Sequence, residues 1–394
     1  MSRFFLSIFH YEVFIKMDFK PAKLILKSGE IFKGLNFGSN HPKAGELIFN
    51  TAMTGYQEII TDLSYTDQLI CFTYPQIGNT GVNKEDLESI DGGCAGVVIK
   101  ELSKIESNWR KDGDLSSFLK EKNIPGIANI DTRKLTRILR DKGSQIAAII
   151  PEEYSENQIK VLFESFDGLK GKDLAKIVST KKPYIWKSPS YKSKVKKSSY
   201  KVVAYDFGVK HNILRLLVDR GCEVIVVPAE TTAEEVMKEN PDGIFLSNGP
   251  GDPEPCEYAV SSIKKLIKSN FPIFGICLGH QLLGLALNLK TEKMKFGHHG
   301  ANHPVQNLQD KTVSITSQNH GFTISEDSLH DDVVVTHRSL FDKSIQGVES
   351  KDGKVFGFQG HPEASPGPKD IQNLFDKFIR NMEIFKKANH DKKK

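Results

Sequence analysis

Cys277 lies in a sequence pattern that can turn a thiol into a nucleophile. An apolar run at 273–276 precedes it and helical leucine spacing begins at Leu278, so we expect a strand that turns into a helix with the cysteine at the corner. Gly275 and Gly279 flank it as Gly-x-Cys-x-Gly, the cysteine counterpart of the nucleophile elbow, whose small residues permit a strained turn. The helix dipole at such a corner favours the thiolate. A buried core cysteine is the alternative, and the paired glycines favour the nucleophile.

A thiolate that cleaves an amide also needs a group that transfers protons, and His361 is the best candidate. It lies in GHPEASPGP, 84 residues after Cys277 and just after an apparent strand, KVFGFQ. We expect this loop to lie outside the core because it is rich in proline and glycine. Glu363 is two residues further on and can hold the imidazole in one tautomer. The alternative for this His-Pro-Glu triplet is an ordinary turn.

The developing oxyanion and the substrate also need polar groups. The N–H of Leu278, directly after the nucleophile, is the expected first donor, and the loop with Gly249 and Gly251 offers a second. Gln281 lies four residues after Cys277 on the same helix face, so its amide can reach a polar substrate; the alternative is a surface glutamine. A phosphate-binding interpretation of the glycine loop is weak because no phosphate-loop motif is present.

Two other polar stretches invite comparison with binding sites. His298, His299 and His303 suggest a metal cluster, but adjacent histidines point in different directions, no acidic partner is expected near them and the ligand set is incomplete, so we predict no metal site. Asn319 and Gly321 fall in SQNHGF, which we interpret as a turn that presents backbone donors and acceptors to a ligand.

The rest of the chain must position these residues in two domains. After Lys201, apolar strands alternate with helices, which indicates a parallel sheet covered on both faces, with ligands at the carboxyl ends of its strands. The earlier half mixes strands and helices without strict alternation, as in an α+β domain. From Lys181 to Lys201, eight lysines and no acidic residue indicate a solvated connector. The predicted units are an amino-terminal domain at 17–180, a basic linker at 181–200 and a second domain at 201–390.

Composition and charge exclude several classes of protein. The 394 residues are 39% hydrophobic and 26% charged, as in a globular protein, and the net charge of +5 comes with no nucleic-acid-binding motif. We therefore expect no nucleic-acid and no membrane partner. The five cysteines are widely spaced and odd in number, which indicates a reducing compartment. Residues 1–16 do not resemble a signal peptide, and translation from Met17 is an alternative start.

Together these motifs resemble a known family. LSNGPGDP, GICLGHQ, FGHHGANHP, SQNHGF and GHPEASPGP are similar to the class I (triad) glutamine amidotransferases, which carry a Cys-His-Glu triad on a flavodoxin-like, mostly parallel sheet. FNTAMTGYQEIITDLSY, YPQIGNTG and NIDTRKLTRILRDKG resemble the amino-terminal domain of the small subunit of glutamine-hydrolysing carbamoyl-phosphate synthetase. The resemblance implies an α/β chain: an amino-terminal α+β domain followed by the amidotransferase domain.

The resemblance assigns roles to residues that match its motifs. It implies that Cys277 is the nucleophile, His361 the acid and base, and Glu363 its orienting partner. The implied contacts to L-glutamine are Ser64, Gly249, Gly251, Leu278, Gln281, Asn319, Gly321 and Phe322. Because only Ser64 comes from the first domain, the pocket is expected at the domain interface. Two positions depart from the family pattern: Leu63 replaces a common proline before Ser64, and Ala301 replaces a usual glycine.

The function implied by the resemblance is hydrolysis of glutamine for a partner. The chain would pass ammonia to the large subunit of carbamoyl-phosphate synthetase in a small-large pair in the cytoplasm, for arginine and pyrimidine biosynthesis. The resemblance implies no cofactor and no metal in this chain, with ATP and Mg²⁺ on the large subunit. Two alternatives stay open here: a catalytically silent assembly subunit, and another class I amidotransferase or free-standing cysteine hydrolase of the same fold.

Overall fold

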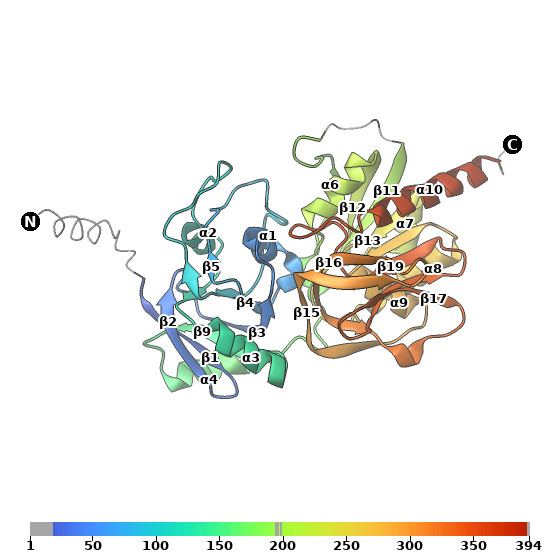
Figure 1. The fold of residues 1–394 in the computed structure, drawn as a ribbon. Coiled ribbons are helices and arrows are strands. Elements are labelled where there is room, and N and C mark those ends of the chain that lie inside the picture. The colour runs from blue at the N-terminus through green and yellow to red at the C-terminus, as the bar shows by residue number, and fades with distance from the viewer. Residues whose placement is uncertain (1–18, 194–196, 198, 392–394) are drawn as a thin grey trace, which may run out of the picture.

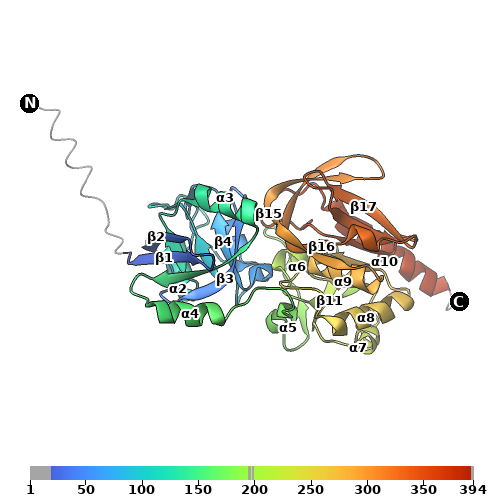
Figure 2. The ribbon, with the colours of Figure 1, turned by 90° about the horizontal axis from the view of Figure 1, so that it is seen from below.

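The computed structural model describes residues 19–193, 197 and 199–391, so the predictions for residues 1–16 and Met17 lie outside the described residues. The chain folds into two units that lie side by side in both views (Figures 1 and 2). Helix α10 (Asn373–Asp391) lies on the side of the second unit that faces away from the first. Within the described ranges, no helix combines the length and apolar character needed to cross a membrane.

The first unit is built on a closed barrel with the strand order β1-β2-β8-β6-β4-β3-β9. In chain order its strands are β1 (Pro21–Leu26), β2 (Ile31–Asn36), β3 (Lys43–Asn50), β4 (Gln68–Phe72), β6 (Gly96–Val98), β8 (Gly126–Ala128) and β9 (Gln145–Pro151). A separate two-stranded sheet pairs β5 (Gln76–Ile77) with β7 (Glu101–Leu102). Closure leaves the barrel without an exposed edge.

Both faces of the central barrel strands are buried, which explains their continuous apolar runs. Leu47 and Leu69 belong to one apolar cluster, and their chain neighbours Ile48 and Ile70 belong to another, because successive side chains of a strand point to opposite faces. The helices of this unit are α1 (Tyr56–Thr61), α2 (Leu115–Glu121), α3 (Thr132–Lys142) and α4 (Glu156–Glu164). The predicted α+β character is therefore confirmed, and the barrel closure is an addition to it.

The second unit contains a ten-stranded sheet with the order β10-β12-β11-β13-β14-β19-β18-β17-β15-β16. Its five central strands run parallel, as predicted. They are β12 (Cys222–Pro228), β11 (Tyr200–Asp206), β13 (Gly243–Leu246), β14 (Ile273–Ile276) and β19 (Val355–Phe358). Antiparallel strands extend this core: β18 (Ile345–Ser350), β17 (Val333–Ser339), β15 (Thr291–Asn307) and β16 (Val313–Ile324), with the short helix η2 (Glu326–Ser328) between β16 and β17.

Helices cover both faces of the parallel strands. α6 (His211–Asp219) and α10 contribute to one apolar cluster. α7 (Ala233–Lys238), α8 (Glu257–Lys268) and α9 (Leu278–Ala286) contribute to another. The strands belong to both clusters, since Val202 and Val203 of β11 are neighbours on opposite faces. This three-layer arrangement places the loops after β11, β13 and β14 at one edge of the sheet, where ligands bind in such folds.

Part of the predicted connector is ordered structure of the second unit. Tyr184–Trp186 form β10, which pairs antiparallel with β12, because its apolar side chains can continue the sheet. Before the connector, α5 (Leu174–Val178) places Ala175 in an apolar cluster of the second unit. Thr180 donates its backbone N–H to Asp206 at 2.8 Å. The chain thus reaches the second unit before residue 181.

Phe245 of β13 is the central ring of the second core, and its removal tests that packing. Its ring lies 5.2 Å from that of Phe274 and 6.1 Å from those of Phe375 and Phe378, and the side chain is fully buried. We expect Phe245→Ala to lower the free energy of unfolding by about 3–5 kcal/mol because it leaves a cavity. Urea titration of the second unit's transition measures this. Ile384→Ala, at an exposed position of α10, is the control and should change it by less than about 0.5 kcal/mol.

Candidate active site

Cys277 occupies the predicted corner between a strand and a helix. β14 ends at Ile276 and α9 begins at Leu278, so the expected strand-to-helix turn is confirmed. Cys277 itself has φ 53° and ψ −107°, a conformation that costs about 1–3 kcal/mol for a residue with a side chain. Its N–H donates to the Phe358 carbonyl of β19 at 3.0 Å, and only 2% of the residue is exposed. The sheet therefore holds the sulfur-bearing residue in a strained backbone state.

The two flanking glycines are required by close backbone contacts. A Cβ on Gly275 would lie 2.6 Å from the carbonyl oxygen of Gly279, and one on Gly279 would lie 2.2 Å from that of Leu246. Real Cβ atoms do not approach backbone that closely. The Gly279 N–H donates to the Ser247 carbonyl at 3.0 Å, so α9 packs directly onto the end of β13. The motif therefore lets the helix begin against the neighbouring strand.

His361 and Glu363 form a buried pair. The Nδ1 atom of His361 lies 2.6 Å from Oε1 of Glu363, and the His361 N–H donates to the Ser317 carbonyl at 2.8 Å. The expectation that this loop lies outside the core is wrong, since His361 is 2% exposed and Glu363 is fully buried. Its proline and glycine residues instead allow an irregular path that carries polar groups inward. By distance and angle, Nε2 of His361 makes no hydrogen bond among the described residues, but His361 lies close enough to the Cys277 thiol for that thiol to raise its pKa, so the two can exchange a proton.

The electrostatics of the pair favour an imidazolium beside a carboxylate. Burial lowers the pKa of His361, but the Glu363 carboxylate and the nearby Cys277 thiol raise it by more, so the net shift is upward. Burial raises the pKa of Glu363, but Lys210 and His361 outweigh it and lower the pKa below its ordinary range. The opposite charges thus stabilise each other in a site from which water is largely excluded.

Lys210 is a site residue that the sequence analysis missed. Its Nζ lies 2.9 Å from Oε1 of Glu363 and donates to the Ala364 carbonyl at 2.5 Å, and its N–H donates to Asn248 at 3.0 Å. Burial lowers the pKa of Lys210, but Glu363 outweighs this and raises it. In the sequence, Lys210 looks like a loop lysine; its place after a parallel strand was the only signal of function.

A cavity beside Cys277 brings together residues from both units. Seven of the eight predicted glutamine contacts line it: Ser64, Gly249, Gly251, Gln281, Asn319, Gly321 and Phe322. Leu278 does not line it, because its side chain belongs to an apolar cluster of the second unit. Glu46, Gln68 and Leu169 also line it and were not predicted, and His320 of the SQNHGF stretch lines it as well. The first three precede the second sheet in the chain, so more of the cavity wall than Ser64 comes from the first half.

Several hydrogen bonds fix this wall. The Cys277 thiol lies 3.4 Å from the Asn319 carbonyl. Gln281 is buried, so the surface alternative is wrong: its Nε2 donates to the Phe322 carbonyl at 2.9 Å and to Gln359 at 3.1 Å. The predicted turn at SQNHGF is also wrong. These residues lie within the continuous strand β16, whose pairing with β15 is interrupted by register shifts.

Ser64 approaches the cavity on the short 3-10 helix η1 (Leu63–Tyr65). The Asp62 carboxylate accepts the Ser64 N–H at 2.9 Å and caps this turn, which forms with leucine at position 63. Asn248 of the second unit donates its Nδ2–H to the Ser64 hydroxyl at 2.8 Å. At the other departure from the family pattern, Ala301 packs against an apolar cluster of the first unit. Ser64 and Ala301 therefore both lie at contacts between the units.

The histidine-rich stretch of β15 has an acidic partner after all. His298 Nε2 lies 2.9 Å from Asp342, which is 44 residues later in the chain, so the expectation of no nearby acid is wrong. His299 Nδ1 instead lies 2.9 Å from the side-chain oxygen of Asn319 on β16. Within the described ranges, no three His, Cys, Asp or Glu side chains are arranged to hold a metal ion. His299 thus supports a cavity residue.

Comparison with known sequences agrees with this division into two units. Residues 24–149 match the family "Carbamoyl-phosphate synthase small chain, CPSase domain", and residues 203–381 match "Glutamine amidotransferase class-I". A carbamoyl phosphate synthase small chain from Pasteurella multocida is 56% identical over 375 residues, which cover 94% of this chain and 97% of the relative. This chain belongs to the carbamoyl phosphate synthase small chain family. The small chain from Vibrio cholerae, another family member, is 54% identical over 376 residues, covering 93% and 99%.

Gly279 allows a direct test of the strand-to-helix turn at Cys277. We expect Gly279→Ala to lower the free energy of unfolding by about 1–3 kcal/mol and to displace Cys277, because the new Cβ would collide with the Leu246 backbone. Gly284→Ala on the same helix meets side-chain atoms of Ile324 and Leu289 and no backbone, and is the control. Urea unfolding and the rate of Cys277 alkylation measure the two effects. Equal behaviour of the two variants would contradict the packing argument.

The His361–Glu363 pair predicts how stability depends on pH. The pKa of His361 is raised from 6.5 to about 10 in the folded chain, so the stabilisation is fully present below pH 6.5 and is lost as the pH rises toward 10. The pKa of Glu363 is lowered from 4.5 to about 2, so its contribution is present above pH 4.5 and is lost as the pH falls toward 2.

The measurement compares the free energies of unfolding of wild type and His361→Asn between about pH 6 and pH 10. The difference should shrink as the pH rises. His330→Asn, at an exposed histidine, is the control and should show no such convergence. A wild-type advantage that stays constant up to pH 10 would contradict the assigned charge state.

Proposed function

We propose that this chain is the glutamine-hydrolysing subunit of a carbamoyl phosphate synthase. The observation that carries this proposal is the strained, glycine-flanked Cys277 beside the buried His361–Glu363 pair, at a cavity lined by both units. The membership of the chain in the small-chain family supports it. It also disfavours the alternative of another class I amidotransferase, since residues 24–149 match a domain named for this family.

In the proposed reaction, the Cys277 thiolate attacks the side-chain amide carbon of L-glutamine and forms a C–S bond. His361 gives its proton to the amide nitrogen as the C–N bond breaks, and ammonia leaves. A water molecule then transfers a proton to His361 while its oxygen attacks the thioester carbon. The C–S bond breaks, glutamate is released, and the thiolate beside the imidazolium is restored. No oxidant, reductant or cofactor enters this balance.

The other site residues receive supporting roles in this proposal. Glu363 keeps Nδ1 of His361 engaged, so Nε2 is the nitrogen that exchanges protons with sulfur and substrate. The N–H groups of Leu278 and of the glycine loop at Gly249 would stabilise the oxyanion. Contacts to the rest of glutamine would come from Ser64, Gly251, Gln281, Asn319, Gly321 and Phe322.

The proposal includes a partner, because the proposed reaction releases ammonia and does not itself consume it. We assign the acceptor site, with ATP and Mg²⁺, to the large subunit of the synthase, since this sequence has no nucleotide-binding motif. We also assign the chain to the cytoplasm, because all five cysteines are free and buried, as expected where thiols stay reduced.

Cys277→Ala tests the reaction and its division between subunits. With the large subunit, ATP and bicarbonate, this variant should lose glutamine-dependent carbamoyl phosphate synthesis and keep synthesis from added ammonium. Cys222→Ala, at another buried cysteine of the second unit, is the matched control and should keep both. Glutamate release and carbamoyl phosphate formation are measured in parallel. Wild type without glutaminase activity would favour a silent assembly subunit, and loss of both activities in Cys277→Ala would refute the assigned role.

A further inference from the structure

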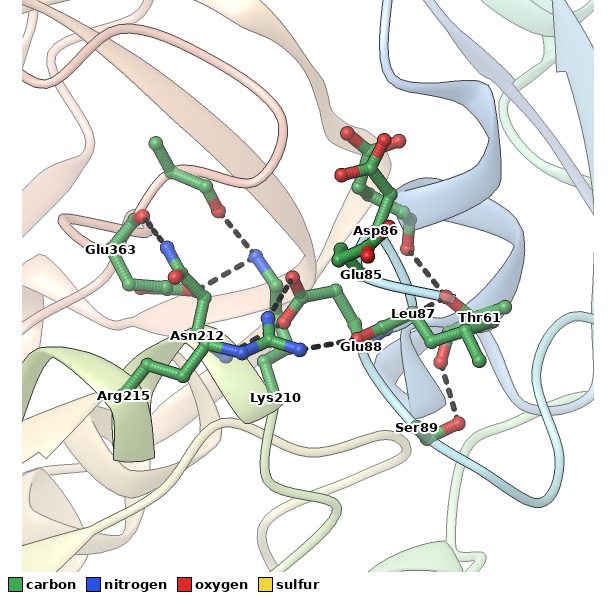
Figure 3. Close-up of polar contacts among 12 residues, drawn as sticks. Thr61, Glu85, Asp86, Leu87, Glu88, Ser89, Lys210, Asn212, Arg215 and Glu363 are labelled. Atoms are coloured by element: carbon green, nitrogen blue, oxygen red, sulfur yellow. Dashed lines mark hydrogen bonds and ion pairs between the residues drawn. The ribbon is translucent and has the colours of Figure 1, made fainter. Parts of the chain in front are cut away.

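A loop of the first unit contacts the start of helix α6 in the second, next to the proposed catalytic residues (Figure 3). Glu88, at the centre of this contact, is only 1% exposed. Its backbone N–H donates to the hydroxyl of Thr61 at 3.0 Å, which anchors it to α1 of its own unit. The side chain points away from that anchor and toward α6. Glu88 is thus a carboxylate of one unit buried against the helix terminus of the other.

Glu88 caps the free N–H groups at the start of α6. Its carbonyl accepts the N–H of His211 at 3.0 Å, and its Oε2 accepts the N–H of Asn212 at 2.9 Å. The first N–H groups of a helix have no partner within it, and a negative charge there is stabilised by the helix dipole. Oε1 also lies 3.5 Å from Nη1 of Arg215, one turn further along. A single residue therefore fixes the first turn of α6.

The residues fixed in this way hold the proposed orienting carboxylate. Asn212 donates its Nδ2–H to the Glu363 carbonyl at 2.5 Å. Lys210, directly before the helix, forms its ion pair with the Glu363 side chain at 2.9 Å. Glu363 is thus held at its backbone and at its carboxylate by residues on either side of His211. Its other contact is Nδ1 of His361.

We propose that Glu88 is a positioning residue for glutamine hydrolysis, through which the first unit sets the start of α6 and, through Lys210 and Asn212, the orientation of Glu363 and His361. This inference rests on the proposed function. It gives the first unit a role in the proton-transfer step in addition to its part in the cavity wall.

A role in which Glu88 only stabilises the contact between the two units explains the observations less well. The loop is already held within its own unit, where Asp86 pairs with Arg110 at 2.6 Å and Asn83 bonds to Gln57 at 2.9 Å. Burial raises the pKa of Glu88 to about 7, although Lys210 and Arg215 oppose the shift, so burying this carboxylate carries a cost. Apolar residues would join two surfaces without that cost. Apolar residues cannot accept the N–H groups at the start of a helix, whereas a carboxylate accepts them in a fixed geometry.

Glu88→Gln tests the inference because, in assays above pH 7, it removes the charge with little change in shape. Misplacement of a catalytic group by a distant change can cost about 100-fold in rate, so we expect kcat for glutamate release to fall by about 10- to 100-fold with little change in KM. Glu85→Gln is the matched control: this carboxylate lies in the same loop, is half exposed and lies 3.9 Å from Arg110. It should leave kcat and KM unchanged.

A double-mutant cycle with Asn212→Ala separates positioning from general loosening. Asn212→Ala keeps the backbone N–H that Glu88 caps but removes the side-chain bond to Glu363. If Glu88 acts through Asn212, the fold-decrease in kcat of the double variant should be smaller than the product of the fold-decreases of the two single variants. Glu88→Asp, which keeps the charge, should recover part of the lost kcat. Melting temperatures of all variants report any loss of stability.

The outcomes distinguish this inference from the proposed function. If the wild type is active, two results would overturn the positioning role and leave the glutaminase assignment intact. One is an unchanged kcat in Glu88→Gln. The other is a lowered melting temperature of Glu88→Gln together with multiplicative kcat effects in the double-mutant cycle. A wild type that releases no glutamate, alone or with the large subunit, would overturn both. A fall in kcat that is non-multiplicative with Asn212→Ala supports the inference.

Discussion

The strained backbone of Cys277 is the constraint on which the rest of the site depends. A non-glycine residue with φ 53° and ψ −107° persists only where the surrounding structure fixes it. Here that structure is the parallel sheet: β14 delivers the residue, β19 accepts its N–H, and Gly279 lets α9 start against β13. Because the sheet and the inner faces of both helix layers are buried, the core of the second unit holds this corner in place.

Around that corner the structure balances buried charge. Glu363 is fully buried, and an isolated carboxylate there would be costly, but Lys210 and His361 lie within 2.9 Å and 2.6 Å of its Oε1. Such an arrangement favours the imidazolium form of His361, which is the form that donates a proton to the leaving nitrogen in the proposed reaction.

The two units are joined by polar contacts that lie beside the site. Asn248 donates to Ser64 across the interface, and the backbone of Thr51 donates to His299 on β15 at 3.2 Å. Glu88 adds a carboxylate at the start of α6. Polar contacts in fixed geometry transmit position more strictly than apolar packing does, since each bond has a preferred direction. A barrel unit placed in this way can complete the cavity and also order the residues behind it.

The local features could be predicted from the residues alone: the strand-to-helix corner at Cys277 with its glycines, the parallel α/β core of the second unit and the α+β character of the first. These follow from periodicity and glycine placement within a few residues. Four features became visible only in the folded chain: Lys210 reaches Glu363 across 153 positions, Asp342 meets His298, SQNHGF is a strand, and Glu88 caps α6. Spacing in a sequence fixes neighbours on one element, whereas contacts between elements depend on how the sheets and units pack.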